Sequence, residues 1–132
     1  MPNNALQIEA THYTLTAITL LMIAVALGAF GAHGLAETVS ETRLSTWRTA
    51  VDYHMSQSLA LFIISLIKPE TLSPWFTWSK RLLLSGILIF SGSLYLLVLF
   101  DMGVLGAITP IGGVAMILAW LSLLLHFLKH HS

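Results

Sequence analysis

The sequence predicts an all-α integral membrane protein, a four-helix bundle in which neighbouring helices run antiparallel. Hydrophobic residues make up 56% of the chain, charged residues only 9%, and the mean hydropathy is +0.83. Soluble domains carry about 25% charged residues, so a soluble fold would lack polar groups for its surface. The chain also contains four apolar stretches, each near the ~20 residues that a helix needs to cross a bilayer. We therefore expect a single transmembrane domain over residues 1–132.

The predicted spans cover approximately residues 13–32, 46–67, 82–100 and 110–127. Runs of this length are helices in lipid, because an open strand leaves its backbone groups without partners. Pro69 ends the second span, since its ring cannot continue a helix. Thr109 and Pro110 predict an N-cap and a first-turn proline for the fourth span. The short linker before Pro110 favours antiparallel packing of the last two helices.

Small residues are expected to bring these helices together. Lipid tails are as apolar as leucine, so helix contact in a membrane depends on close packing rather than on the hydrophobic effect. The expected packing positions are Ala24, Gly28, Gly31, Ala32, Gly86, Gly92, Gly112 and Gly113. We interpret them as contacts in a compact bundle, not as a pore or a cofactor groove. Trp120, near the middle of the fourth span, is expected to pack between helices.

The distribution of positive charge predicts the orientation. With four spans, both termini and the middle loop lie on one side of the membrane. That side carries Lys68, Lys80, Arg81 and Lys129, whereas the other side carries Arg43 and Arg48. Short cytoplasmic loops are enriched in Lys and Arg, so we expect the N- and C-termini to be cytoplasmic.

Composition and motifs exclude several functional classes. The formal net charge of zero provides no basic surface for nucleic acid. The absence of cysteine rules out disulfides, thiolate metal sites and iron–sulfur clusters. No phosphate-binding loop, dinucleotide fingerprint or nucleophile elbow is present. We expect no metal, no cofactor and no enzymatic activity.

Polar residues at the entrance of the second span are the main candidates for a site. They are Arg48, Asp52, Tyr53, His54 and Gln57, with His33 at the end of the first span. Polar groups at membrane depth are costly, so they mark a function or a structural contact. Arg48 and Asp52 are four residues apart and can form an ion pair on one helix face.

Three interpretations of this polar vestibule remain open. The first is a structural contact that fixes the outer ends of the first two helices. The second is a binding or permeation site lined by His33, Asp52, His54 and Gln57. A solute- or proton-conducting module of this size would need to be a homo-oligomer. The third is a contact surface of an accessory subunit in a larger membrane-protein complex. The expected partners are therefore membrane lipids, copies of this chain or another membrane protein.

Four markers give the chain a resemblance to a known family. They are GAFGAHGL at residues 28–35, Trp47 to Met55 followed by Leu59-Ala60-Leu61, FSGSLY at residues 90–95, and TPIGG at residues 109–113 with Trp120. In this order and spacing the chain resembles the YgdD/YwdK family of small four-helix bacterial membrane proteins. The resemblance implies a bacterial inner-membrane protein and no established activity. The family usually has histidine where this chain has Gln57, which weakens a mechanism based on proton exchange there.

Overall fold

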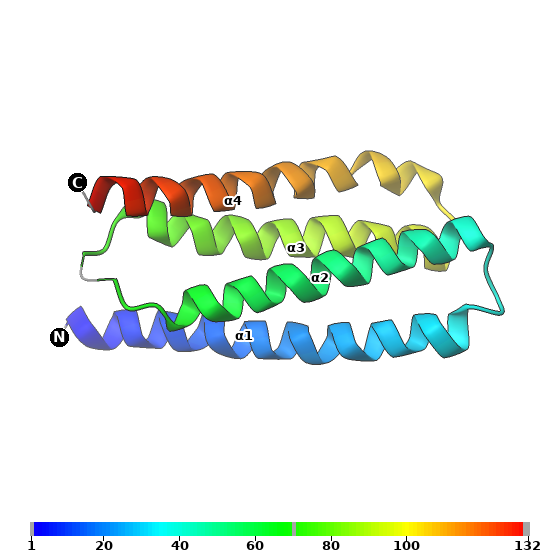
Figure 1. Ribbon diagram of the computed structural model, residues 1–132, viewed down its shortest axis with the longest axis horizontal. Coiled ribbons are helices and arrows are strands. Elements are labelled where there is room, and N and C mark those ends of the chain that lie inside the picture. The colour runs from blue at the N-terminus through cyan, green and yellow to red at the C-terminus, as the bar shows by residue number, and fades with distance from the viewer. Residues whose placement is uncertain (1, 70, 131–132) are drawn as a thin grey trace.

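The computed structural model describes residues 2–69 and 71–130, and this part of the chain is helical with no strand. Its four long helices are α1 (Pro2–Phe30), α2 (Glu41–Leu66), α3 (Pro74–Phe100) and α4 (Thr109–His130). Successive helices run in opposite directions, and both termini lie at one end of the molecule (Figure 1). The all-α prediction is confirmed.

Three segments are long and apolar enough to cross a membrane: Asn4–Leu35, Pro74–Phe100 and Gly103–His130. The second helix is 26 residues long, which is sufficient to span, but its first half is polar. Figure 1 shows α2 running obliquely between α1 and α3, and it contacts both helices. We therefore expect its polar half to enter the membrane beside the apolar helices on which it packs.

A π-helical turn, Gly31–Leu35, ends the first span. The chain then turns sharply, and α2 begins at the N-cap Ser40, whose hydroxyl oxygen accepts a hydrogen bond from the Arg43 amide at 3.2 Å. Such a cap satisfies one of the backbone donors that a helix start leaves without a partner. This start lies five residues before the predicted one.

The helix that contains the third predicted span, residues 82–100, begins before that span. The helix begins at Pro74, where Ser73 caps it by accepting a hydrogen bond from the Phe76 amide at 3.3 Å. Proline at the first helical position costs no hydrogen bond, because its missing N–H would have no helical partner. The local capping signal therefore extends α3 beyond its apolar run.

The expected N-cap at Thr109 is also wrong. A 3-10 turn, Gly103–Ala107, leads into α4, and Thr109 is already its first residue. The Thr109 hydroxyl instead lies 2.6 Å from that of Ser93 on α3. At the end of α3, Asp101 adopts a left-handed backbone conformation. Its carboxylate forms an ion pair with Arg43, with 2.9 Å between Oδ1 and Nη2. Both contacts tie the helix ends together at the face opposite the termini.

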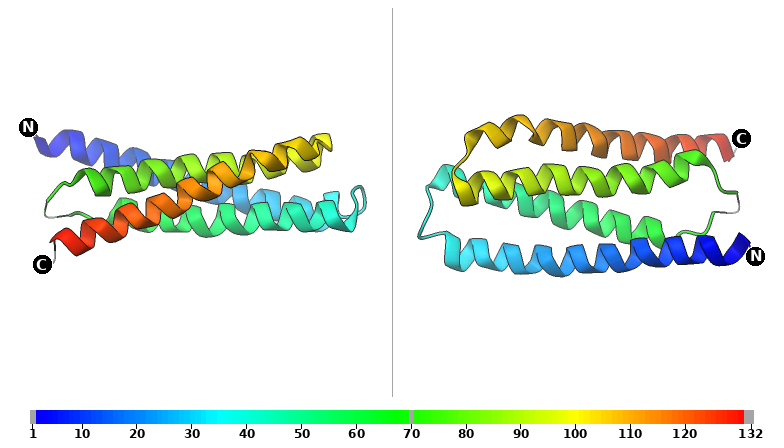
Figure 2. Two further views of the ribbon diagram at one scale, coloured as in Figure 1. Left: turned by 90° about the horizontal axis from the view of Figure 1, so that it is seen from above. Right: turned by 180° about the vertical axis from the view of Figure 1, so that it is seen from behind.

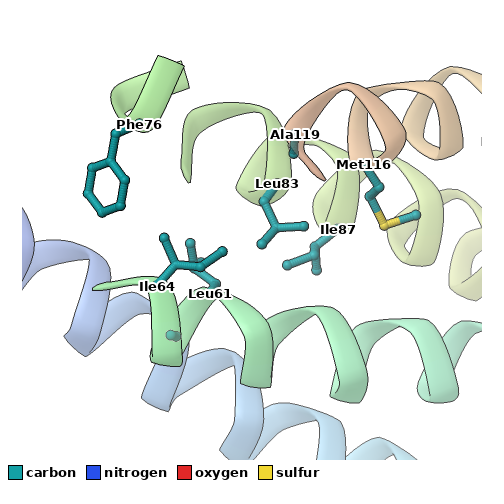
Figure 3. Packing of buried hydrophobic residues seen from close by; sticks show 8 residues of the cluster. Leu61, Ile64, Phe76, Leu83, Ile87, Met116 and Ala119 are labelled. Carbon is teal, nitrogen blue, oxygen red and sulfur yellow. The ribbon is translucent and has the colours of Figure 1, made fainter. Parts of the chain in front are cut away.

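The helices pack in chain order: α1 on α2, α2 on α3, and α3 on α4. The first and last helices lie on opposite sides of the molecule, with α2 and α3 between them (Figures 1 and 2). One apolar cluster fills the half near the termini. It contains Leu61, Ile64, Leu83, Ile87 and Met116 (Figure 3). A second cluster around Trp47 and Leu97 fills the opposite half.

Glycines set the closest approach between α3 and α4. A Cβ added at Gly112 would overlap the backbone nitrogen of Phe90. One added at Gly86 would lie 2.5 Å from the Met116 Cγ atom. Gly113 is different, because its nearest neighbour is the Phe90 ring at 3.7 Å. The two helices therefore touch through Gly86 and Gly112, with room remaining at Gly113.

Of the other predicted packing positions, some lie in close helix contacts and others do not. Ala24 is fully buried, and a Cβ at Gly28 would lie 3.3 Å from Val51 on α2. Ala32 is exposed, and a Cβ at Gly92 would meet no atom within 4 Å. Ala32 and Gly92 are thus outside the tight helix contacts of the described chain.

Candidate binding site beside His54

The polar residues of α2 face in different directions, and the expected Arg48–Asp52 ion pair is absent. Both side chains are exposed on the outward face of the helix. Within the described ranges, the ion pairs are Arg43–Asp101 and Lys80–Glu9. An exposed i,i+4 pair gains only about 0.2–0.5 kcal/mol, which barely offsets the lost side-chain freedom.

Gln57 forms a hydrogen bond with α4 at the surface of the bundle. The indole N–H of Trp120 donates a hydrogen bond to the Gln57 amide oxygen at 2.9 Å. Trp120 is 43% exposed, so the prediction that it packs between helices is wrong. Its ring lies on the surface and links α4 to α2 there. This contact supplies the amide oxygen with a donor where lipid offers none.

His54 is the one member of the predicted set that turns into the core, where it is only 4% exposed. Its Nδ1 lies 2.8 Å from the hydroxyl oxygen of Tyr95 on α3. The Tyr95 ring packs against Trp47, with ring centroids 4.7 Å apart. Trp47 in turn donates its indole N–H to the Leu27 carbonyl of α1 at 2.9 Å. These contacts join three helices around one polar centre.

Gly31 makes this arrangement possible. A Cβ at Gly31 would lie 2.5 Å from Cδ1 and 2.7 Å from Nε1 of Trp47. The indole therefore occupies the space that any other residue would need. Phe30 packs edge-on against the same indole, with ring centroids 5.7 Å apart. The π-helical turn at the end of α1 thus seats Trp47, and π-turns of this kind are frequent at functional sites.

The second ring nitrogen of His54 has no ordinary hydrogen bond. Nε2 is buried and makes no hydrogen bond of standard geometry, although the Leu20 backbone carbonyl interacts with the ring. The Tyr95 hydroxyl makes no other hydrogen bond among the described residues, so we assign its proton as donated to Nδ1. Neutral imidazole then carries its own proton on Nε2. The result is a buried N–H donor in need of an acceptor, which is costly at this depth.

A cavity of about 220 Å³ adjoins this imidazole. Residues of α1 and α3 form most of its walls, and His54 is the residue of α2 that lines it. Ile23 and Leu88 on its rim are exposed on the outside of the bundle. Two lining residues carry hydroxyls, and both hydroxyls are already bonded: Ser91 donates to the Ala50 carbonyl at 2.8 Å, and that of Tyr95 lies 2.8 Å from His54 Nδ1. The exposed wall is therefore apolar, and the cavity opens sideways toward lipid.

The other predicted site residues lie outside this cavity. His33 is exposed in the π-helical turn that follows α1, and Asp52 faces away from the core. Tyr53 is also exposed, with its ring against Phe90 at a centroid distance of 4.5 Å. The described residues contain no group of three or more His, Asp or Glu side chains arranged to hold a metal. The predicted vestibule is thus not one continuous site.

Sequence reasoning missed Tyr95 and Trp47 as members of the polar centre. Both residues occur in the markers that carry the family resemblance, but neither was among the candidate site residues. Aromatic residues with a polar atom need a hydrogen-bond partner when buried in a membrane helix. That need was the available signal for pairing Tyr95 with His54.

The fold and the cavity define a small integral membrane protein with four helices and a buried His–Tyr pair at a lateral apolar opening. Residues 27–113 match the family model described as "Protein of unknown function (DUF423)". A UPF0382 membrane protein of Staphylococcus aureus is 49% identical over 108 residues, which are 82% of this chain and 88% of that protein. The chain therefore belongs to this family of membrane proteins.

Further relatives agree with this assignment. The UPF0382 membrane protein YwdK of Bacillus subtilis is 40% identical over 116 residues, which are 83% of this chain and 89% of that protein. This match confirms the family resemblance derived from the sequence. No solved structure matches the chain significantly. The matched range 27–113 contains Leu27, Trp47, His54 and Tyr95, so the family model covers the polar centre.

Proposed function

We propose that this protein is a non-enzymatic binding protein of the bacterial inner membrane. It holds a lipid-soluble molecule with a carbonyl-type oxygen in the lateral cavity beside His54. The observation that carries the proposal is the buried ring nitrogen Nε2 of His54, which has no hydrogen-bond partner and lies in the wall of an apolar cavity. Both termini are cytoplasmic in this proposal, because the end that carries them also holds Lys68, Arg81 and Lys129.

The volume of the cavity suits only the polar end of a lipid-soluble molecule, not the whole molecule. At about 220 Å³ it is smaller than the 300–1,000 Å³ typical of pockets that enclose a drug-sized ligand. An elongated molecule would place its polar end beside His54 and leave its apolar tail among the lipids. The rim residues Ile23 and Leu88 would contact that tail. Such an occupant satisfies the imidazole without admitting water.

The same geometry supports binding over catalysis or conduction by one chain. Asp52 and Tyr53 are the other acid–base candidates, and both face outward. Toward the termini, the buried side chains of Leu61 and Leu83 separate His54 from the charged groups at that end. A continuous polar path would have to pass through this apolar layer.

Mass spectrometry of molecules that copurify in mild detergent tests the proposal. The wild-type protein should retain one lipid-soluble compound near one equivalent, whereas His54→Phe should retain about tenfold less. This ratio corresponds to the loss of one buried hydrogen bond. The control is His33→Phe, an equivalent change at an exposed position, which should retain the wild-type amount. Equal retention by the two variants, or no retained compound in the wild type, would contradict the proposal.

A second function, contact with another copy of this chain, is favoured by the outward face of α2. Ser45, Arg48, Thr49, Asp52 and Ser56 form one exposed stripe at helical spacing. Arg48 lies about 10 Å and Asp52 about 16 Å along α2, counted from its first residue, Glu41. Unpaired charges at such depth are costly against lipid. A twofold axis along the membrane normal would pair Arg48 with the partner's Asp52, which makes the stripe self-complementary.

Single-cysteine crosslinking tests this contact, because the natural chain contains no cysteine. Thr49→Cys should form a disulfide-linked dimer in native membranes, since a twofold axis places the same residue at the same depth in both copies. Leu96→Cys on the exposed side of α3 is the control and should remain monomeric. Comparable dimer yields from both variants would rule out a specific contact through α2.

A further inference from the structure

A second cavity of about 240 Å³ lies at the end of the molecule that carries the termini. It is formed by the beginning of α1, the end of α2 and the beginning of α3. Leu6, Leu72 and Phe76 provide apolar walls, whereas Lys68, Lys80 and Glu9 provide charged groups. Unlike the cavity beside His54, it combines charge with apolar surface.

Lys80 is the unusual member of this cavity, because it is only 6% exposed. Its ammonium lies 4.9 Å from the centroid of the Tyr13 ring and 5.2 Å from that of Phe76. The nearest carboxylate oxygen, from Glu9, is 3.8 Å away, which is longer than a hydrogen bond. Glu9 therefore pairs with the ammonium only loosely, and no shorter contact to an oxygen acceptor is present within the described ranges. A buried cation in this state is stabilised when an anionic oxygen reaches it.

We propose that this cavity binds the phosphate group of an anionic phospholipid, with Lys80 as its main contact. Lys68 on the rim adds a second positive charge, and the side chain of Glu9 is partly exposed and can turn toward water. Basic pockets between membrane helices on the cytoplasmic side are typical lipid-headgroup sites. The acyl chains of such a lipid would lie along Leu6 and Leu72.

This inference goes beyond the proposed function and does not depend on it. The buried side chains of Leu61 and Leu83 lie between this cavity and the one beside His54. The two sites also select for different chemistry. The first requires a neutral oxygen and an apolar body, whereas the second requires a negatively charged group at the membrane surface.

Native mass spectrometry of the delipidated full chain tests the proposal, with added phosphatidylglycerol or phosphatidylcholine as probes. Wild-type protein should retain phosphatidylglycerol preferentially. Lys80→Gln should reduce that retention about fivefold, the effect expected for one basic group at a membrane surface. Lys80→Arg keeps the charge and should retain the lipid. Arg81→Gln removes the same charge from the exposed neighbouring position outside the cavity and should have a clearly smaller effect.

A variant on the rim keeps the test informative if Lys80→Gln fails to fold. Lys68 is exposed, so Lys68→Gln leaves the core intact and should reduce retention by a smaller factor. Competition with millimolar inorganic phosphate distinguishes two ligands for the same phosphate site. If the phosphate displaces bound phosphatidylglycerol, the site binds the free ion. If phosphatidylglycerol stays bound, the site binds the lipid headgroup. Equal losses in Lys80→Gln and Arg81→Gln, or equal retention of both lipids by the wild type, would overturn the proposal.

Discussion

The Gly112→Ala variant is expected to separate α3 from α4 and to lower the free energy of unfolding by about 1–3 kcal/mol, the usual cost of overpacking. The added Cβ would overlap the backbone nitrogen of Phe90, and a second contact with the Phe90 Cα would be only 2.8 Å. Both atoms belong to the backbone, so no side-chain rotation can relieve the overlap. The helices must move apart, and the contact at Gly86 is lost with them.

Gly92→Ala is the matched control on α3, because a Cβ at Gly92 would meet no atom within 4 Å. Alanine favours a helix over glycine by about 1 kcal/mol, so this variant should be neutral or slightly stabilised. Unfolding by dodecyl sulfate in mixed micelles, followed by circular dichroism, measures both variants. Similar destabilisation of the two would show that Gly112 is not a special contact.

The Gly31→Ala variant is expected to disrupt the polar centre and to cost about 1–3 kcal/mol of unfolding free energy. Its Cβ would lie 2.5 Å from the Trp47 ring, which is only 1% exposed and has no free space to enter. Displacing the indole would break its hydrogen bond to the Leu27 carbonyl and its packing against Tyr95. We therefore expect this variant also to lose the compound retained beside His54.

Gly34→Ala, within the same π-helical turn, is the control for this prediction. Its Cβ would lie 3.0 Å from the Phe30 ring, which is 45% exposed and can turn outward. We expect a much smaller loss of stability in detergent and normal retention of the bound compound. Wild-type stability of Gly31→Ala would contradict the role assigned to this contact.

Much of the fold could be predicted from hydropathy, because a bilayer imposes helices and a minimum length. The helices differ in length from the predicted spans where local chemistry extends a helix beyond its apolar run. Ser73 and Pro74 start α3 through a cap and a favourable first position, neither of which changes the hydropathy. Ser40 does the same for α2. At Thr109 the partner Ser93 lies on the preceding helix, so local sequence could not identify the contact.

The candidate site was predictable only in part. Polarity at membrane depth identified His54, but a single helix does not reveal which face its neighbours cover. Its partner Tyr95 lies on another helix, 41 positions away in sequence. The same limit explains why Gly92 was predicted as a packing position. Gly86 and Gly92 lie on the same helix, but only Gly86 faces α4 closely. Arg48 and Asp52 had a suitable spacing, yet their outward position gives the ion pair little stabilisation.

The most direct test of the binding site is a measurement at the His54 imidazole itself. Nitrogen-15 solid-state NMR of histidine-labelled protein would compare membranes of bacterial lipid extract with membranes of pure synthetic phosphatidylcholine. The spectrum of His54→Phe would identify the signal of His54. We predict that Nε2 shifts to a hydrogen-bonded position in the bacterial extract only, whereas Nδ1 remains bonded to Tyr95 in both. An identical Nε2 signal in the two membranes would contradict binding at this cavity.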